Sequence, residues 1–236
     1  MLNKNIIKNF FFDLDHTLWD FEKNSSLAFE KVFYELKIEV CLESFLKEYK
    51  KINKFLWKLY QEDSISHDDL KKFRLTKTFT KIDYEFDKGR ISEISNLYIE
   101  YLSKYNHLLD GAIPLLNFLK DKYNINIITN GFEKVQSNKI ISSGLSPFIM
   151  NLFTAESIGY KKPNPKIFLH ALRKTDTLPL HAVMVGDDLE ADIFGAMDVG
   201  MQAIHFNSKN KFTNNSFLSV NSLDDIINYL NFQGSN

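Results

Sequence analysis

The stretch Phe10-Phe-Phe-Asp-Leu-Asp-His-Thr17 closes an apolar run that begins at Ile6 and contains two aspartates one residue apart. The run is too short for an ordinary helix and predicts a buried β-strand. Side chains two positions apart in a strand point the same way, so Asp13 and Asp15 are expected to converge at its carboxyl end, where α/β sheets bind ligands. Two carboxylates there suit a cation, or a nucleophile with a proton carrier; the alternative is that Asp15 simply caps the next segment.

The chain after Gly111 alternates between strand and helix patterns. Asn164-Pro165 opens one predicted helix, and Ser222 with Asp225 opens the last one as a capping box. The predicted strands after the first, which covers residues 6–14, are Ile125–Thr129, Leu152–Thr154, Ala182–Val185, Gln202–Phe206 and Phe217–Val220. Such alternation is typical of an α/β fold, with a parallel sheet and helices on both faces.

Residues 24–106 differ from the rest of the chain, because their apolar side chains recur only at helical spacing. Short polar segments separate the helical patterns, and none of this block predicts a strand. Since the block directly follows the first strand, we expect it to be an all-helical insertion. We predict a core of residues 1–17 and 109–236 and a helical domain of residues 18–108.

The composition limits the classes of function. Lys and Arg number 29 against 30 for Asp and Glu, and no long basic block indicates a groove for a nucleic-acid polymer. The single cysteine, Cys41, excludes an internal disulfide framework and fits a reducing compartment. The N-terminal apolar run lacks the form of a signal peptide, and no segment is long enough to span a bilayer. We therefore expect a cytoplasmic protein that binds neither membranes nor nucleic acids.

A second polar group, Thr129-Asn-Gly131, follows the predicted strand that contains Ile127. A threonine hydroxyl, free backbone N–H groups and the start of a helix predicted over residues 133–143 form a good cradle for a phosphate or another oxyanion. The alternative is a plain turn between strand and helix, which Thr-Asn-Gly also favours.

A third group places Lys162 immediately before Pro163, with Pro165 starting a helix two residues later. The prolines restrict the backbone around an otherwise flexible side chain. The ammonium group suits a phosphate or a carboxylate, whereas the alternative is a solvated surface pair with Lys161.

A fourth group, Gly186-Asp187-Asp188, follows an apolar strand, and Asp192 comes about one helical turn later. Gly186 permits a tight bend, and we expect Asp187 to lie beside Asp13 if their strands are neighbours. Asp192 is expected to orient Asp187 or Lys162. The alternative is N-capping of a helix over residues 189–198, which explains only one of the aspartates.

Together these groups offer a cation site, a nucleophile, a hydroxyl-plus-amide cradle and a lysine, which is what the movement of a phosphoryl group requires. In order, they resemble the four motifs of the haloacid dehalogenase (HAD) superfamily: Asp13-Leu-Asp15-His-Thr17, Thr129-Asn-Gly131, Lys162-Pro163, and Gly186-Asp187-Asp188 followed by Asp192. The resemblance covers essentially the whole chain. It implies a Rossmann-like core, and the helical insertion is similar to a type C1 cap.

Five further stretches resemble the pyrimidine 5′-nucleotidase (YjjG-like) branch of that superfamily. They are Thr17-Leu-Trp-Asp-Phe21, Trp57-Lys-Leu-Tyr60, Leu70-Lys-Lys-Phe-Arg74, Ile128-Thr-Asn-Gly-Phe132 and Lys162-Pro-Asn-Pro-Lys-Ile-Phe168. Trp19 stands where that branch usually has Phe. The resemblance implies an Mg²⁺-dependent phosphatase that hydrolyses phosphomonoesters, with (deoxy)pyrimidine nucleoside 5′-monophosphates as substrates. The aromatic residues of the inserted domain either stack on a base or form its core.

The resemblance also implies the role of each site residue. Asp13 attacks phosphorus and forms an aspartyl-phosphate, while Asp15 protonates the leaving oxygen and then takes a proton from water. The implied Mg²⁺ ligands are the Asp13 and Asp187 carboxylates and the Asp15 backbone carbonyl. The groups implied to bind the transferring oxygens are Thr129, the Asn130 amide, Gly131 and Lys162. Asp192 and Asp188 are expected to lie outside the coordination sphere, and Asp188 departs from the small hydroxylated residue common at its position.

Several alternative functions share parts of this pattern. A phosphatase for another small phosphoester, such as phosphoglycolate or a sugar phosphate, and a β-phosphoglucomutase-like mutase carry the same motifs. A hydrolytic dehalogenase is not expected to carry an acidic residue at position 15, so Asp15 argues against this alternative. A receiver domain is about half as long, and a non-catalytic binding module is expected to have lost a motif residue. The expected enzyme is a monomer or a dimer that binds a small phosphomonoester.

Overall fold

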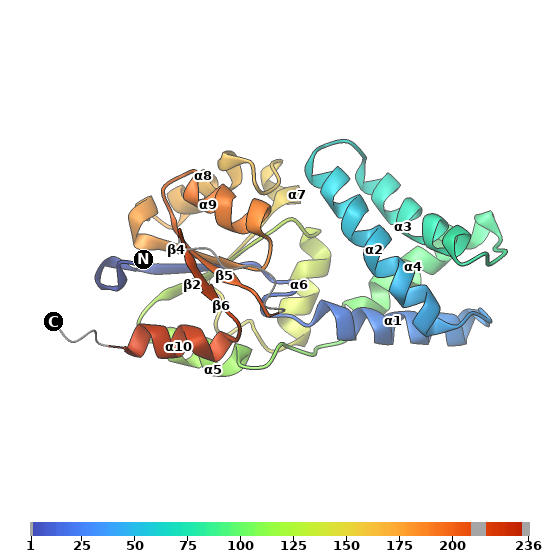
Figure 1. The fold of residues 1–236 in the computed structure, drawn as a ribbon, viewed down its shortest axis with the longest axis horizontal. Helices are drawn as coiled ribbons and strands as arrows, with labels where there is room; N and C mark the ends of the chain where they lie inside the picture. The colour runs from blue at the N-terminus through green and yellow to red at the C-terminus, as the bar shows by residue number, and fades with distance from the viewer. Residues whose placement is uncertain (1, 209–215, 233–236) are drawn as a thin grey trace. The chain divides into compact units, whose positions relative to one another are not determined.

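The computed structural model describes residues 2–208 and 216–232. The chain divides into two compact units, one formed by Met1–Phe21 with Asn106–Asn236 and the other by Glu22–Tyr105 (Figure 1). These divisions fall a few residues from the predicted positions near 18 and 109. Among the helices of the described residues, none is both long enough and apolar enough to cross a membrane.

The first unit is built on one sheet of parallel strands, in the order β3-β2-β1-β4-β5-β6. The strands are β1 (Asn9–Phe12), β2 (Asn124–Thr129), β3 (Asn151–Thr154), β4 (Ala182–Gly186), β5 (Gln202–Phe206) and β6 (Leu218–Val220). The predicted α/β class with a parallel sheet is therefore confirmed. Because β1 lies between β2 and β4, the three motif-bearing strands are direct neighbours.

The predicted first strand, residues 6–14, is longer than the observed one. Residues Lys4–Ile6 form a short 3₁₀ helix instead. Ladder hydrogen bonds around β1 begin at Lys8, whose N–H donates to the His181 carbonyl, and reach Asp13, whose N–H donates to the Val185 carbonyl. The neighbouring strands begin opposite Asn9, so the residues before Lys8 have no strand beside them to pair with.

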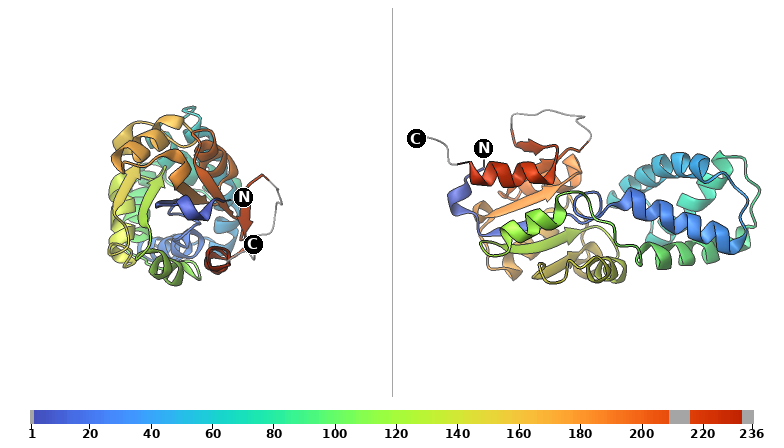
Figure 2. Two further views of the ribbon diagram at one scale, coloured as in Figure 1. Left: turned by 90° about the vertical axis from the view of Figure 1, so that its left-hand side faces the viewer. Right: turned by 90° about the horizontal axis from the view of Figure 1, so that it is seen from below.

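Helices cover both faces of the sheet. Figure 1 shows α5 beside α10 on one side of the strands and α8 beside α9 on the other, and Figure 2 shows the strands between these pairs. The helices of this unit are α5 (Ala112–Leu119), α6 (Glu133–Ser142), α7 (Ala155–Ile158), α8 (Pro165–Lys174), α9 (Gly195–Met197) and α10 (Leu223–Asn231). The helix predicted over residues 189–198 is a π-helical turn, Leu189–Phe194, that continues into α9.

The three phenylalanines of β1 explain why this strand lies at the centre. Phe11 belongs to a buried cluster with residues of α8 such as Phe168 and Leu172. Phe10 and Phe12 stack on each other with ring centroids 6.0 Å apart, as side chains on one face of a strand do. All three are fully buried, so β1 is apolar on both faces, as a central parallel strand must be.

The second unit consists of helices and the turns between them, with no strand within its residues 22–105, in agreement with the predicted all-helical insertion. Its helices are α1 (Phe21–Leu36), α2 (Leu42–Gln61), α3 (His67–Lys81) and α4 (Ile91–Leu102), with a 3₁₀ turn at Lys88–Arg90. An aromatic cluster joins them, in which Phe29 of α1 stacks on Tyr98 of α4 at 4.0 Å and meets Tyr49 of α2 edge-on at 4.6 Å. The helical periodicity seen in the sequence is therefore the periodicity of a buried core.

Candidate active site

The motif residues meet at the carboxyl ends of three neighbouring strands. Asp13 follows β1, Thr129 ends β2, and Asp187 follows β4. One ligand oxygen from each of Asp13, Asp187 and Asp192 lies within 4.8 Å of the other two. This is the edge at which parallel sheets bind ligands.

Lys162 is buried against this carboxylate group and has a partner for each of its three N–H donors. Its Nζ donates to Asp13 Oδ1 at 2.7 Å, to Asp192 Oδ1 at 2.6 Å and to the Ile128 carbonyl at 2.8 Å. Burial alone would lower the pKa of Lys162, but the Asp13 and Asp192 carboxylates outweigh it and raise that pKa above its ordinary value. The lysine is therefore a fixed positive charge beside Asp13.

Asn130 holds the backbone of Lys162 in place. Its side-chain Nδ2 donates to the Lys162 carbonyl at 2.9 Å, and its Oδ1 accepts from the Lys162 N–H at 2.7 Å. Both ends of the amide side chain are therefore engaged by the protein.

Asp13 is nearly buried, and one of its oxygens is available. Oδ1 accepts from Lys162, whereas Oδ2 receives no hydrogen bond from any of the described residues. Burial raises the pKa of Asp13 to about 7, because the loss of hydration and the Asp192 carboxylate together outweigh the effect of Lys162. The site thus holds more negative charge than one lysine neutralises.

Asp187 lies at the rim of the group with part of its surface open to solvent. Surrounding protein atoms nevertheless remove much of its hydration, and the carboxylates of Asp192, Asp13 and Asp188 add repulsion. Desolvation is the larger effect and the repulsion by these charges the smaller one, and together they raise the pKa of Asp187 well above its ordinary value. A second available carboxylate, under strain from like charges, is therefore present beside Asp13.

Asp192 differs from these two, because both of its oxygens are engaged by protein groups. Oδ1 accepts from Lys162, and Oδ2 accepts from the Asp188 N–H at 3.1 Å. A Cβ atom on Gly186 would overlap the Asp192 carboxylate, so a glycine is required there for space. The geometry therefore has Asp192 orient Lys162 from behind.

Asp188 caps the π-helical turn that follows it. Its Oδ1 accepts from the N–H groups of Glu190 and Ala191, each at 2.9 Å. This is the N-capping alternative considered from the sequence, and it accounts for this one aspartate. The capping does not extend to Asp187 or Asp192.

Asp15 meets two residues of α6 that the sequence analysis did not single out. Lys139 Nζ donates to both oxygens of Asp15, at 2.6 and 2.9 Å, and Gln136 Nε2 donates to Asp15 Oδ2 at 3.0 Å. Gln136 also reaches Thr129 Oγ1, at 2.8 Å. The only signal in the sequence is two polar residues three apart, on one face of the helix that begins after Gly131.

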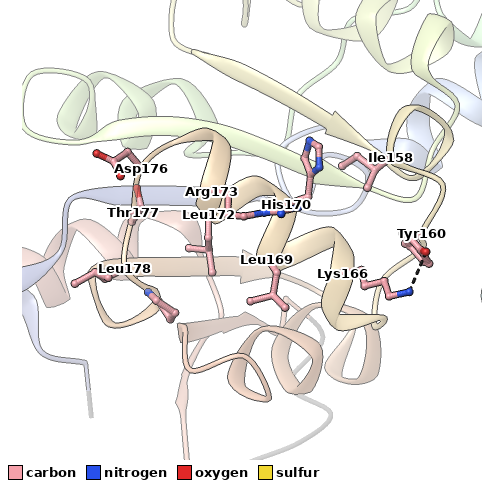
Figure 3. Close-up of a pocket in the computed structure, with 11 residues that line it drawn as sticks. Ile158, Tyr160, Lys166, Leu169, His170, Leu172, Arg173, Asp176, Thr177 and Leu178 are labelled. Carbon is pink, nitrogen blue, oxygen red and sulfur yellow. Dashed lines mark hydrogen bonds between the residues drawn. The ribbon is translucent and has the colours of Figure 1, made fainter.

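One pocket of the described residues lies away from this group. It measures about 700 Å³ and runs along α8, where Figure 3 shows Leu169, His170 and Arg173 along its length and Lys166 joined to Tyr160 at one end. None of its lining residues is an aspartate of the group described above. The chemistry therefore points to the strand ends and not to this pocket.

Comparison with known proteins gives one family and a consistent set of relatives. A family model described as haloacid dehalogenase-like hydrolase matches residues 7–200. Pyrimidine 5′-nucleotidase YjjG of Escherichia coli (strain K12) is 31% identical over 202 residues, which are 85% of this chain and 86% of that protein. Glyceraldehyde 3-phosphate phosphatase of Pyrococcus furiosus (strain ATCC 43587 / DSM 3638 / JCM 8422 / Vc1) is 32% identical over 201 residues, which are 85% and 80% of the two chains.

Among solved structures, that of the protein YfnB from Bacillus subtilis, bound to magnesium, is similar along nearly the whole chain. It superimposes with a TM-score of 0.85 at 26% identity, covering 96% of this chain and 99% of that one. The likeness extends over both compact units.

Proposed function

The chain belongs to the haloacid dehalogenase-like hydrolases, and we propose that it is a magnesium-dependent phosphatase that forms an aspartyl-phosphate on Asp13. The observation that carries this proposal is the meeting of Asp13, Asp187 and Asp192 around the buried Lys162. Phosphoryl transfer depends on positioning and on neutralising charge, which a preorganised group of this kind supplies.

The residues present fit a magnesium ion, which prefers oxygen ligands. Asp13 and Asp187 offer available carboxylate oxygens, and Asp15 offers its backbone carbonyl. Asp192 is less suited, because Lys162 and the Asp188 N–H already engage its oxygens. Desolvation raises the pKa of Asp187 most, and the neighbouring carboxylates raise it further by repulsion that a cation would relieve. When bound there, magnesium supplies charge neutralisation for the transferring phosphoryl group.

In the first step a carboxylate oxygen of Asp13 attacks phosphorus. The bond from phosphorus to the ester oxygen breaks, and Asp15 donates a proton to that oxygen as it leaves. Lys162 stays beside the attacking carboxylate, and the Thr129 hydroxyl and the Asn130 backbone lie at the end of the neighbouring strand to hold phosphoryl oxygens.

In the second step water attacks the phosphorus of the aspartyl-phosphate. Asp15, now ionised, takes a proton from that water, and the bond from phosphorus to Asp13 breaks to release phosphate. An acid at position 15 is what separates this route from a hydrolytic dehalogenase.

For the substrate we propose nucleoside 5′-monophosphates with a pyrimidine base. Support comes from the similarity to YjjG and from the nucleotidase-like stretches such as Thr17-Leu-Trp-Asp-Phe21. A second candidate is a small phosphoester such as glyceraldehyde 3-phosphate, favoured by the similar identity to the Pyrococcus furiosus phosphatase. We also propose that the enzyme is located in the cytoplasm, because a chain with a single cysteine forms no internal disulfide and fits a reducing compartment.

The test is phosphate release by the purified protein, with Mg²⁺ and with EDTA, from dUMP, dTMP, UMP, dAMP, phosphoglycolate, glyceraldehyde 3-phosphate and β-glucose 1-phosphate. We expect release only with Mg²⁺, fastest from the pyrimidine nucleotides. Asp13→Asn keeps the shape of the side chain but removes the nucleophile, so we expect it to fold normally and to lose turnover by several orders of magnitude.

Each outcome separates the candidates. If another phosphoester releases phosphate fastest, the proposed phosphatase activity stands and the proposed nucleotide substrate is replaced by that phosphoester. Undiminished release in EDTA contradicts the metal, and undiminished release by Asp13→Asn contradicts the nucleophile. Conversion of β-glucose 1-phosphate to the 6-phosphate without release of phosphate favours a mutase.

A further inference from the structure

Two residues of α6, Gln136 and Lys139, are almost completely buried although both are polar. Their exposed fractions are 1% and 2%. A buried ammonium group is costly unless it is paired, and a buried amide is costly unless it is hydrogen-bonded. Both residues find their partners in the candidate active site.

Lys139 lies between a carboxylate and aromatic rings. Its Nζ donates to Asp15 Oδ1 at 2.6 Å and to Oδ2 at 2.9 Å, and it lies 4.2 Å from the centroid of the Trp19 ring. Ring faces attract cations, so the lysine is held from both sides. A bidentate contact of this kind fixes the plane of the Asp15 carboxylate.

Gln136 joins two catalytic candidates through one nitrogen. Its Nε2 donates to Asp15 Oδ2 at 3.0 Å and to Thr129 Oγ1 at 2.8 Å. Because an ionised carboxylate only accepts hydrogen bonds, the amide nitrogen and not the amide oxygen must face Asp15. A Cβ atom on Gly131 would overlap the Gln136 side chain, so this glycine makes the approach possible.

These contacts determine that the Thr129 hydroxyl acts as a hydrogen-bond donor toward the substrate. Thr129 Oγ1 accepts from Gln136 Nε2 and also from the Gly131 N–H at 3.1 Å. A hydroxyl oxygen has two acceptor positions, and both are filled. The remaining function of the Thr129 hydroxyl is to donate, which is what an anionic phosphoryl oxygen requires.

The same count distinguishes the two oxygens of Asp15. Oδ2 accepts from Lys139 and from Gln136, so its two acceptor positions are filled. Oδ1 accepts from Lys139 only, among the described residues. One lone pair therefore remains on Oδ1 and none on Oδ2.

We infer that Gln136 and Lys139 are positioning residues, and that they make Oδ1 the atom through which Asp15 exchanges its proton. Lys139 acts on the reaction through Asp15, whereas Gln136 acts through both Asp15 and Thr129. This inference rests on the proposed phosphatase activity and does not depend on which phosphoester is the natural substrate.

The test compares two aryl esters of similar shape, phenyl phosphate and 2,4-dinitrophenyl phosphate. Phenolate is a strongly basic leaving group that needs a proton, whereas dinitrophenolate leaves without one. The quantity measured is kcat/KM, which covers the steps up to departure of the leaving group, so the later role of Asp15 toward water does not enter.

For Lys139→Met we expect kcat/KM to fall about 100-fold or more on phenyl phosphate and less than about threefold on the dinitrophenyl ester, since general acid catalysis contributes factors of that size. Gln136→Met is expected to slow both esters, because Thr129 contacts the phosphoryl group common to them. Lys139→Arg is expected to recover part of the phenyl phosphate activity, since a guanidinium also pairs with both carboxylate oxygens. The control is Lys134→Met, an exposed lysine of the same helix, for which no change is expected.

Circular dichroism and thermal unfolding establish that each variant is folded. Equal losses on both esters for a folded Lys139→Met would show a merely structural role and overturn the inference, as would unchanged rates on both. If Lys139→Met does not fold, the pattern of Gln136→Met decides: a loss confined to one ester, or no loss, contradicts its double role. Failure of the wild type to hydrolyse either ester contradicts the proposed phosphatase itself, which is a separate result.

Discussion

Lys162 shows how a flexible side chain becomes a fixed charge. Its three N–H donors form hydrogen bonds to Asp13, Asp192 and the Ile128 carbonyl. The Asn130 side chain forms two hydrogen bonds to the backbone of Lys162. An ammonium group with every donor used and its surroundings buried does not need to reorganise when charge develops nearby. The restriction by the flanking prolines is visible in the sequence, but these partners are not.

Replacing Lys162 by methionine tests this charge at the residue scale. The change leaves the Asp13 and Asp192 carboxylates buried without their cation, so we expect the free energy of unfolding to fall by about 3–5 kcal/mol. We expect kcat to fall by at least about 100-fold, as when one preorganised donor is removed from an active site. Urea unfolding and the phosphate-release assay measure the two effects. Lys161→Met is the control, and equal effects of both variants would contradict the role of Lys162.

Magnesium binding has a readout that does not require turnover. Because a ligand that binds only the folded protein stabilises it, we expect Mg²⁺ at about 100 times its dissociation constant to add about 2.7 kcal/mol to the free energy of unfolding. Asp187→Asn is expected to lose most of this gain. Asp188→Asn is expected to keep it, because Asp188 caps a helical turn and asparagine caps almost equally well. An equal loss in both variants would make Asp188 a ligand and contradict the assignment.

At the scale of elements, the strands were predictable and several details were not. Alternating apolar runs placed β2 to β6 within about a residue, because buried parallel strands are short and bounded by turn residues. The start of β1 was wrong, since pairing depends on where its neighbours begin. The π-helical turn at Leu189–Phe194 and the contacts of Gln136 and Lys139 depend on side-chain geometry that residue spacing does not encode.

The sheet also contains a row of hydrogen-bonded amides that no sequence pattern indicated. Asn151 Nδ2 donates to Asn126 Oδ1 at 2.7 Å, Asn126 Nδ2 to Asn9 Oδ1 at 3.2 Å, and Asn9 Nδ2 to Thr177 Oγ1 at 2.7 Å. The row crosses β3, β2 and β1. Polar side chains inside a sheet are tolerated only because each has a partner.

Asn126→Ala interrupts this row. Asn9 Oδ1 is buried and then lacks its donor, so we expect the free energy of unfolding to fall by about 1–3 kcal/mol. Chemical unfolding measures the change. Asn117→Ala, an exposed asparagine of α5, is the matched control and is expected to change stability by less than about 0.5 kcal/mol. Similar values for the two variants would mean that the row contributes nothing.

At the scale of the whole molecule, the chain consists of two units with separate cores. The order of the sequence motifs and the family resemblance were sufficient to predict the α/β core and its helical insertion, and both are confirmed. The core and the insertion could be predicted separately, because the helical insertion follows the first strand and the alternation of strands and helices resumes after it. The roles of the site residues remain proposals.

The separation of the cores leads to a prediction for Phe29→Ala. Phe29 is fully buried among the aromatic rings of the helical unit, so its truncation is expected to cost about 3–5 kcal/mol. Amide hydrogen exchange is expected to accelerate within residues 22–105 and to remain unchanged in the strands β1, β2 and β4. Tyr34→Ala, at an exposed position of the same helix, is the control. Equal acceleration in the strands would show that the two units unfold together.

Acid quenching detects whether Asp13 becomes phosphorylated during turnover. Protein mixed with Mg²⁺ and dUMP is quenched within the first turnovers, reduced with borohydride, and analysed by mass spectrometry of the peptide that contains Asp13. In the wild type we predict conversion of Asp13 to homoserine, at a level that depends on Mg²⁺. We predict no conversion of Asp15, and no homoserine in the Asp13→Asn variant. Continued release of phosphate with Asp13 unmodified at every quench time would show that Asp13 is not the nucleophile.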